Sequence, residues 1–298
     1  MLLTAPRLWI VATPLGNPGD LSPRARTVLT EADLVLAEDT RRTARLFRDC
    51  GIEARRLLSF HDHNETDRQE HVLRALREGQ SVALVSDAGT PLLADPGYRL
   101  VRACRKEGLA VSPLPGPSAP VAALSAAGLP PLPHSFLGFL PRDASGRDAL
   151  FAAFAHVPGS LIFFERKDRL KESLAQAARL LGPREVAVCR ELTKEHEEFI
   201  LTRLENSEGL PDDLLGEITV IIGPPEQVSR SPESEVTALL TQELKTDGPD
   251  GKPRQVARRV QAMVRGWSGK EIYALITAAT DRPDNISSAQ RSLHPGNI

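Results

Sequence analysis

Short apolar runs alternate with helical patterns over the first 115 residues, and this alternation restricts the fold more than any other feature of the sequence. Each run is four to six residues long, which suits a buried strand and is too short for a helix. Strands that alternate with helices predict an α/β domain with a parallel, doubly wound sheet and right-handed crossovers. The expected strands are Leu8–Ala12, Asp33–Ala37, Leu57–Phe60, Val82–Val85 and Leu109–Leu114.

Polar or small residues follow each of these runs. Open α/β sheets bind ligands in the crevice at the carboxyl ends of their parallel strands, where such clusters meet. The most unusual cluster follows the central strand, where Ser86–Gly97 reads SDAGTPLLADPG. Within it, Gly89 allows a ligand to approach the backbone, and Asp87 accepts hydrogen bonds from an amine or a ribose. An ordinary turn is the alternative, but it does not require so many unusual residues. We therefore predict a ligand loop.

A second α/β domain with a mixed sheet is predicted after the helix-breaking cluster Pro113–Pro120. In it, Glu198–Thr202 and Glu217–Ile222 are expected as a final antiparallel pair of strands. A small helical extension follows, and the polar tail after Asp281 is expected to be disordered. The predicted domain ranges are 1–115, 116–225 and 226–298.

The helical extension carries a local excess of basic residues. Between Lys245 and Glu271 there are seven basic and three acidic residues, in a chain whose net charge is -2. Arg254 and Arg258 are expected on one helical face together with Arg265. The apolar face of this helix should dock on the body of the protein; its residues are Val256, Val260, Met263 and Trp267. The predicted RNA-binding residues of this segment are Arg254, Arg258 and Arg259, and a solvated surface stripe is the alternative.

Composition excludes several classes of protein. The small negative charge gives no global basic field, so contact with nucleic acid requires a local patch. The three cysteines have neither disulfide nor metal-ligand spacing, which favours a reducing cytoplasm. No apolar run approaches the ~18 residues of a membrane span, and the N-terminal residues lack the pattern of a signal peptide. We expect a cytoplasmic protein that does not associate with membranes.

Two further ligand patterns are incomplete. Gly16, Gly19 and Glu38 have part of the spacing of a dinucleotide site, but Pro14 and Pro18 remove amide donors that a pyrophosphate would use. His61-Asp62-His63 has the residue types of a metal pair. However, residues at i and i+2 of an extended segment point to opposite faces. We therefore predict that this segment binds no metal. It is expected to be a polar loop that either binds substrate or is only solvated.

Seven motifs lie in order between about Leu8 and Gly223: PLGNPGDLSPRA, AEDTRRT, FHDHNE, VALVSDAGTPLLADPGYRLV, PLPGPSAPVAALSAAGLP, GFLPR and CRELTKEHEE. In this order and spacing they resemble the small-subunit ribosomal RNA methyltransferase I family, the ribose 2′-O-methyltransferase branch of the tetrapyrrole-methylase superfamily. The tetrapyrrole branch carries Gly-Gly-Asp-Pro where this chain has Ser86–Pro91, which argues against a porphyrin or corrin substrate. Phe164 stands where many relatives have tyrosine.

The resemblance implies a homodimer of two-domain subunits that hold S-adenosylmethionine in the interdomain cleft. It also implies 2′-O-methylation of a cytidine ribose in the decoding region of 16S rRNA, as free RNA or in the assembled small ribosomal subunit. A tetrapyrrole methyltransferase and a non-catalytic RNA-binding α/β protein are the alternatives. The residues expected to contact the cofactor are Pro14, Gly16, Asp87, Ala88, Gly89, Thr90, Ser118, Ala119 and Phe164.

Methyl transfer to a ribose hydroxyl benefits from a base near the oxygen. Glu165 follows a buried strand and Asp39 follows another, so these two carboxylates are the candidate catalytic bases. For Glu165 the alternative is a structural partner of Arg166 or Arg190. The residues predicted to hold the RNA backbone near the cleft are Arg41, Arg42, His61 and His63.

Overall fold

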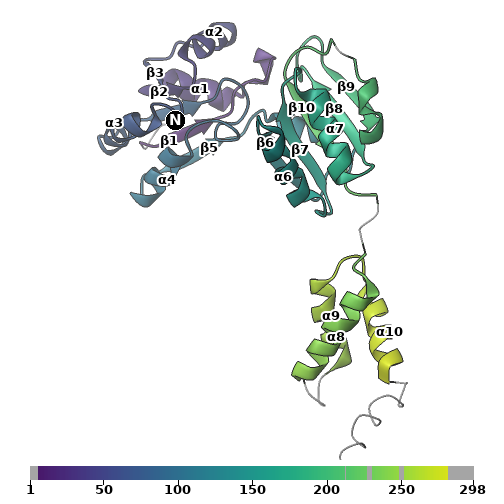
Figure 1. Cartoon of the computed structure of the whole chain (residues 1–298). Helices are drawn as coiled ribbons and strands as arrows, with labels where there is room; N and C mark the ends of the chain where they lie inside the picture. Colours follow the sequence, from purple (N-terminus) through teal and green to yellow (C-terminus); the bar gives the residue numbers. More distant parts are fainter. Residues whose placement is uncertain (1–5, 212, 227–229, 248–251, 281–298) are drawn as a thin grey trace, which may run out of the picture. The chain divides into compact units, whose positions relative to one another are not determined.

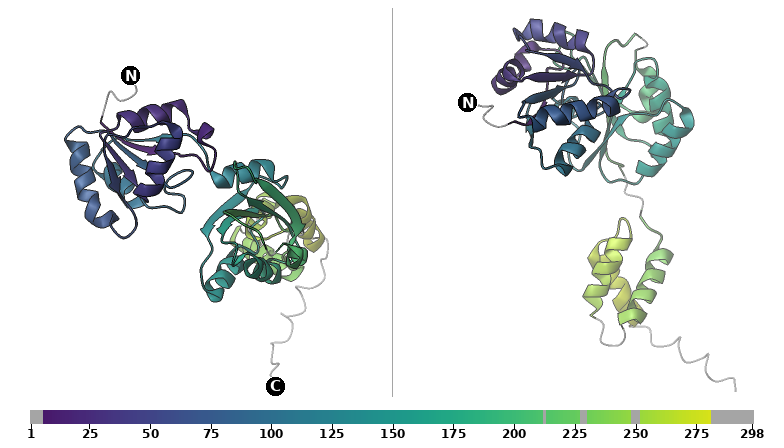
Figure 2. Two further views of the ribbon diagram at one scale, coloured as in Figure 1. Left: turned by 90° about the horizontal axis from the view of Figure 1, so that it is seen from above. Right: turned by 90° about the vertical axis from the view of Figure 1, so that its left-hand side faces the viewer.

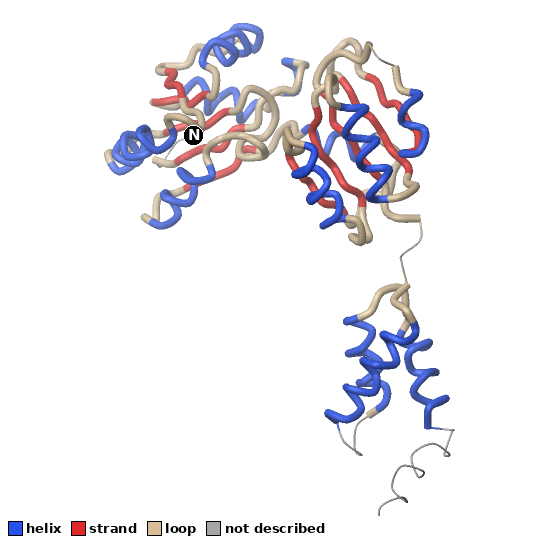
Figure 3. The backbone as a smooth tube through the Cα atoms, in the orientation of Figure 1, coloured by secondary structure: helices blue, strands red, loops and turns tan. Residues whose placement is uncertain are grey.

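The computed structural model of the chain describes residues 6–211, 213–226, 230–247 and 252–280. Its residues separate into two compact units, Met1–Pro225 and Glu226–Ile298. The first unit contains two five-stranded sheets (Figures 1 and 3).

The first sheet is parallel throughout and has the strand order β3-β2-β4-β1-β5, so the predicted sheet and its central strand are confirmed. Its strands are β1 (Leu8–Val11), β2 (Leu34–Ala37), β3 (Leu57–Ser59), β4 (Val82–Val85) and β5 (Val111–Leu114). The connecting helices are η1 (Pro18–Asp20), α1 (Pro23–Glu31), α2 (Thr40–Cys50), α3 (Glu65–Arg77) and α4 (Tyr98–Lys106).

Helices cover both faces of this sheet (Figure 2). Successive side chains of a strand point to opposite faces. Trp9 and Val35 accordingly pack with α1 and α2, and Leu8 and Leu34 pack on the other side with α3 and α4. Because both faces are buried, the strands are apolar at nearly every position, which explains the continuous apolar runs in the sequence.

The second sheet is mixed, as predicted, and has the strand order β6-β7-β10-β8-β9. Its strands are β6 (His134–Phe139), β7 (Ser160–Glu165), β8 (Glu185–Arg190), β9 (Glu198–Arg203) and β10 (Ile218–Ile222). Helix α5 (Ala119–Ala126) packs on one face, and α6 (Ala144–Phe154), α7 (Leu170–Leu181) and η2 (Leu204–Gly209) pack on the other.

The predicted pairing of the last two strands is wrong. β9 and β10 do not pair with each other, because each lies antiparallel to β8, on opposite sides of it. All five residues of β10 are buried, which suits an interior position between β7 and β8. β9 has no fully buried residue and forms the edge of the sheet.

The described residues of the second unit form helices α8 (Glu233–Asp247), α9 (Pro253–Met263) and α10 (Gly269–Thr280). Val256 and Val260 of α9 pack into a core formed with α8 and α10, which corrects the prediction that this face docks on the body. Met263 is largely exposed. Arg265 lies beyond the end of α9, so it does not continue the face of Arg254 and Arg258. The tail after Asp281 lies outside the described residues.

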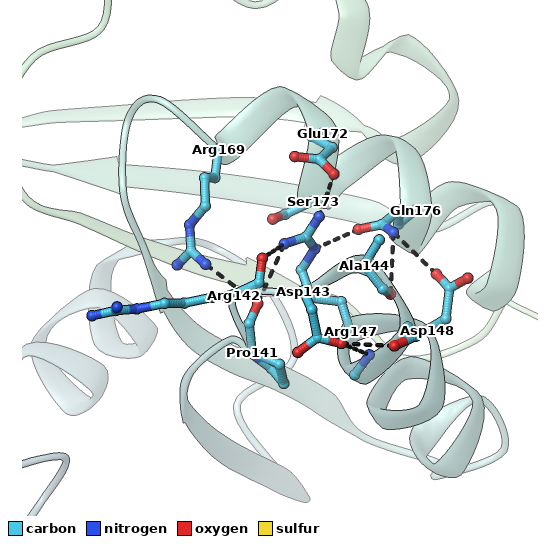
Figure 4. A network of polar contacts seen from close by, with 12 residues as sticks. Pro141, Arg142, Asp143, Ala144, Arg147, Asp148, Arg169, Glu172, Ser173 and Gln176 are labelled. Carbon is cyan, nitrogen blue, oxygen red and sulfur yellow. Dashed lines mark hydrogen bonds and ion pairs between the residues drawn. The ribbon is translucent and has the colours of Figure 1, made fainter.

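A buried arginine joins α6 to α7 and to the loop after β6 (Figure 4). Arg147 is 1% exposed. Its guanidinium donates to the backbone oxygens of Pro141 and Arg142, at 3.3 and 2.8 Å. It also donates to the side chains of Glu172 and Gln176 on α7. Because Arg147 satisfies several acceptors at once, it fixes the loop after β6 against α7.

We expect Arg147→Ala to lower the free energy of unfolding by about 2–4 kcal/mol, because it removes buried packing and leaves carbonyl oxygens without donors. Urea titration followed by circular dichroism measures the change. Arg179→Ala is the matched control, since Arg179 forms an exposed ion pair with Asp148 on the same pair of helices. Loss of that surface pair should cost less than about 1 kcal/mol. Equal losses in the two variants would show that the buried network adds no stability.

Candidate active site

A cavity of about 580 Å³ lies at the carboxyl ends of the strands of the first sheet. Loops after β1, β2, β4 and β5 line it, so four of the five predicted clusters converge there. Residues at the ends of β6 and β7 and at the start of β10 complete its wall. From the first sheet the lining residues are Leu15, Glu38, Arg42, Asp87–Thr90, Leu93–Asp95 and Ser118–Pro120. From the second sheet they are Phe139, Phe164–Asp168 and Gly216–Thr219.

An isolated backbone bridge fixes the loop after β4. The Thr13 N–H donates to the Gly89 oxygen at 2.8 Å, and the Gly89 N–H donates to the Thr13 oxygen at 3.0 Å. Gly89 has φ +79°, a conformation that glycine adopts without strain. A Cβ at this position would also lie 3.2 Å from the Leu15 side chain. Glycine at position 89 therefore suits both the backbone conformation of this loop and its contact with Leu15.

Three carboxyl groups from two loops, Glu38, Asp87 and Asp95, line the cavity together. Burial raises the pKa of Asp95 from 3.8 to about 7, with further contributions from Glu38 and Asp87. Burial also raises the pKa of Glu38, and the charge of Asp87 adds to this effect. The side chains of Glu38 and Asp95 are hydrogen-bonded to each other. This pair therefore holds a proton near neutral pH.

Asp87 joins the loops after β2 and β4. One carboxylate oxygen accepts from the Asp39 N–H at 3.2 Å, and the other forms an ion pair with Arg42 at 3.2 Å. Burial nevertheless raises the pKa of Asp87 above its ordinary value. Asp87 thus has the cavity position expected from the sequence.

Asp39, one of the two predicted bases, caps α2. Its carboxylate accepts the backbone N–H groups of Arg41 and Arg42, at 2.8 and 3.3 Å. These two hydrogen bonds lower the pKa of Asp39. Asp39 and Arg41 lie outside the cavity lining, as far as the described residues define it.

Glu165, the other predicted base, is buried at the end of β7. Its carboxylate accepts from Ser173 Oγ at 2.6 Å and from the Arg166 N–H at 2.8 Å. It also forms an ion pair with Arg169 at 2.5 Å. Arg169 in turn donates to the Pro141 oxygen at 3.3 Å, which ties the loop after β7 to the loop after β6 (Figure 4). Glu165 therefore anchors the wall of the cavity.

The remaining predicted cofactor residues divide into two groups. Ala88, Thr90, Ser118, Ala119 and Phe164 line the cavity. Ser118 Oγ is buried and has no hydrogen-bond partner within the described part of the chain. Pro14 and Gly16 lie outside the lining formed by the described residues. Gly16 instead leaves space for the Lys194 side chain, which a Cβ would overlap.

The predicted RNA contacts are likewise divided. Arg42 lies at the cavity, whereas the described lining does not include His61 or His63. In the second unit, Arg254 and Arg258 line a groove of about 360 Å³, and Arg259 forms an ion pair with Glu243 at 2.7 Å. The other lining residues of this groove are Ala257, Gln261, Gly269, Lys270 and Tyr273.

Within the described residues, no group of three or more His, Cys, Asp or Glu side chains is arranged to hold a metal ion. Every helix in the same ranges is too short or too polar to cross a membrane.

Sequence reasoning missed Asp95, Phe139, Arg166 and Lys167 as cavity residues. Asp95 lies in the SDAGTPLLADPG segment and Phe139 in GFLPR, so their motifs were visible. Their places in the cavity depend on loop conformation. In particular, Leu92 and Ala94 both have φ +73°, and residues of these types seldom adopt such values.

Comparison with known proteins agrees with this geometry. Residues 7–207 match the family described as Tetrapyrrole (Corrin/Porphyrin) Methylases. The chain is 42% identical over 286 residues to ribosomal RNA small subunit methyltransferase I of Micromonospora olivasterospora, covering 95% of this chain and 90% of the relative. It is 44% identical over 259 residues to the protein of the same name from Mesorhizobium japonicum, covering 86% and 87%.

Solved structures show the same fold. Uroporphyrin-III C-methyltransferase of Thermus thermophilus, complexed with S-adenosylhomocysteine, has a TM-score of 0.53 and 20% identity, over 73% of this chain and 97% of that protein. Diphthine synthase has a TM-score of 0.57 and 18% identity, over 72% and 89%. These likenesses concern the fold alone, whereas the sequence relatives cover nearly the whole chain at much higher identity. The chain therefore belongs to the tetrapyrrole methylase family and, within it, to the ribosomal RNA small subunit methyltransferase I family.

Proposed function

We propose that this protein transfers a methyl group from S-adenosylmethionine to the ribose 2′-oxygen of a cytidine in the decoding region of 16S rRNA. The observation that carries the proposal is the cavity where the strand ends of the first sheet meet the second sheet, in a chain of this family. The relatives over 86–95% of the chain favour RNA over a porphyrin as the substrate.

The cavity suits the cofactor in size and chemistry. Its volume of about 580 Å³ is within the usual range of ligand pockets, ~300–1,000 Å³. Ser118 Oγ offers an unused polar group, and the glycine backbone at Gly89 allows close approach. The residues that would hold the cofactor are Asp87–Thr90, Ser118, Ala119 and Phe164. S-adenosylmethionine supplies a methyl group on a sulfonium sulfur, so the donor itself requires no metal.

The protein's own task is then to position the ribose and to accept a proton. Transfer to the 2′-oxygen would break the bond between the methyl carbon and sulfur and leave a neutral thioether, and the proton of the ribose hydroxyl would pass to a base. We assign this role to the Glu38–Asp95 pair, because it lines the cavity and a base acts best when its pKa is near the operating pH. The contacts of Asp39 and Glu165 are those of a helix cap and a loop anchor.

A direct test of the proposed function is to map ribose methylation in rRNA. Purified protein, S-adenosylmethionine carrying a labelled methyl group and unmethylated 30S subunits should give one 2′-O-methylated cytidine, located by mass spectrometry of nuclease fragments. Free 16S rRNA in a parallel reaction distinguishes the two forms of substrate. Methyl transfer to a base, to a porphyrin or to nothing would contradict the proposal.

Asp95→Asn should change how stability depends on pH. The folded protein holds the Asp95 proton up to about pH 7, whereas the unfolded chain releases it near pH 4. Wild-type stability should therefore fall as pH rises through this window, and the variant should lack that loss. Allowing for solvent screening, the variant should gain about 1 kcal/mol relative to wild type between pH 4 and pH 8 in urea titrations.

Asp143→Asn is a control in which the effect on stability should depend on pH in the opposite direction. Hydrogen bonds from the Ser145 hydroxyl and the Gly146 N–H lower the pKa of Asp143 at the start of α6. Its contribution to stability is present at neutral pH and is lost as pH falls through the lowered pKa. Asp143→Asn should therefore destabilise the protein more at pH 7 than at low pH.

The Asp95→Asn variant also tests the assigned base. Single-turnover methyl transfer by the wild type should rise with an apparent pKa near 7, and the variant should lose this limb and be roughly 10²–10⁴-fold slower. Glu165→Gln should keep the wild-type pH profile, provided that calorimetry shows intact cofactor binding. An unchanged profile in both Asp95→Asn and Glu38→Gln would exclude the pair as the base.

For the helical unit we propose that Arg254 and Arg258 contact RNA phosphates together with Lys270, because these three cations line one groove. Arg259 is left out of this contact set because it is paired with Glu243. The homodimer implied by the resemblance and the cytoplasmic location expected from the cysteine pattern belong to the same overall proposal.

Arg254→Ala/Arg258→Ala should bind rRNA more weakly than wild type. Removal of each phosphate contact should lower the magnitude of the slope of log affinity against log salt by roughly 0.7–0.9. Filter binding over a range of salt concentrations measures both quantities. Arg265 is an exposed residue just beyond the end of α9, so Arg265→Ala should leave the salt dependence of RNA binding unchanged. A double variant that matches wild type would show that the groove is only surface.

A further inference from the structure

Phe139 is a large apolar side chain left exposed on the wall of the cavity. It is the last residue of β6, and 58% of its surface is exposed. Single exposed apolar residues are common on protein surfaces and need no explanation by themselves. Phe139 differs because it lines the main cavity.

An irregularity in β6 places Phe139 there. Phe136 pairs with Ile162 and Phe139 with Phe164, so three steps along β6 correspond to two along β7. Gly138 lies within this irregularity and has φ +69°. In a regular strand Phe136 and Phe139 would point to opposite faces. Bulges of this kind re-aim side chains next to functional sites.

The bulge brings both rings to the same neighbour. The ring of Phe164 lies 5.0 Å from that of Phe136 and 5.2 Å from that of Phe139, measured between centroids. Phe164 is partly buried and Phe136 packs against the core below α5. The exposed ring of Phe139 therefore packs on Phe164, which in turn packs on Phe136.

Two cations line the same cavity as this ring. Arg166 and Lys167 follow β7 directly, and both are exposed. The Arg166 side chain is 68% exposed and its ion pair, at 3.2 Å, is with Asp168 in the same loop. Such an exposed pair is weak and exchanges readily for another anion. Glu165 and Arg169 hold this loop from below, and Figure 4 shows Arg142 of the neighbouring loop extending away from the network.

We propose that Phe139 is the stacking platform for an unpaired RNA base, and that Arg166 and Lys167 hold the adjoining phosphates. An aromatic ring beside exposed cations is the combination that binds single-stranded nucleic acid. A base inside a duplex cannot stack on a side chain, so the substrate class is single-stranded or looped RNA. This inference rests on the proposed function, since it assigns the RNA path at the same cavity.

The carboxyl groups of the cavity support this arrangement. Phosphates would be repelled by Glu38, Asp87 and Asp95, so the RNA backbone should remain at the rim. An uncharged ribose can enter, and the base attached to it is then near Phe139. Only a nucleotide whose base has left its stack can place its ribose in the cavity, its base on Phe139 and its phosphates near Arg166 and Lys167.

The test is binding of a short fluorescein-labelled single-stranded RNA to the full-length protein, followed by anisotropy, with the duplex of the same sequence in parallel. Phe139→Ala should weaken single-strand binding by on the order of 10–100-fold and leave duplex binding unchanged. Phe139→Trp should retain it. Arg166→Ala and Lys167→Ala should each lower the magnitude of the salt slope by about 0.7.

Matched controls are Leu201→Ala, an equally exposed apolar residue on the edge strand β9, and Arg179→Ala, a paired cation on α7. Both should bind RNA as wild type does. Sedimentation of Phe139→Ala tests the competing role of a contact between subunits. A lower mass for this variant than for wild type, or unchanged single-strand affinity, would overturn the proposal.

Failure of the two proposals is distinguishable, because the binding assay needs no methyl transfer. Phe139-dependent RNA binding without transfer supports the platform and contradicts the proposed reaction. Transfer to rRNA that is insensitive to Phe139→Ala, Arg166→Ala and Lys167→Ala contradicts the platform alone. Absence of binding of the short RNA by the wild type contradicts the platform, and the methylation assay on 30S subunits then decides the proposed reaction by itself.

Discussion

Two hydrogen bonds between the backbones of Thr13 and Gly89 hold the cavity in place. β1 and β4 are neighbours in register, with Val11 opposite Val85, so the chain leaves both strands at the same level. The bridge then fixes the loop after β4, from which Asp87 reaches the loop after β2 and Thr90 donates to Pro117 after β5 at 2.9 Å. The four cavity loops of the first sheet are thus attached to one another, and the bridge requires the positive φ that glycine adopts at position 89.

Charged side chains of both signs line this cavity. Glu38, Asp87 and Asp95 lie on loops of the first sheet together with the cation Arg42, and the second sheet supplies Arg166, Lys167, Asp168 and Glu217. Burial raises the pKa values of Glu38, Asp87 and Asp95. Ionisation of these groups in the folded protein therefore lowers its stability. Such strain is typical of functional sites, where pKa values are shifted for a chemical task.

The sequence predicted the features that follow from local pattern. Runs such as Val82–Val85 are apolar because both faces of the sheet are covered, and Asp87 is placed by the end of its strand. Features that depend on distant partners were not predictable. The position of β10 between β7 and β8 reflects competition among strands for the interior of a sheet, and Arg265 leaves its helix because α9 ends at Met263.

Glu165 and Asp95 show why the choice of base could not be made from the sequence. Both carboxylates follow buried strands or sit in tight loops, and Glu165 is the more deeply buried. Depth alone would favour Glu165. However, Glu165 is surrounded by donors, namely Ser173, Arg169 and a backbone N–H, which fix its side chain in the wall of the cavity. Burial raises the pKa of Asp95, and the nearby acids Glu38 and Asp87 raise it further. Burial and neighbouring groups together decide whether a carboxyl group anchors a loop or exchanges a proton, and those neighbours come from segments far apart in the chain.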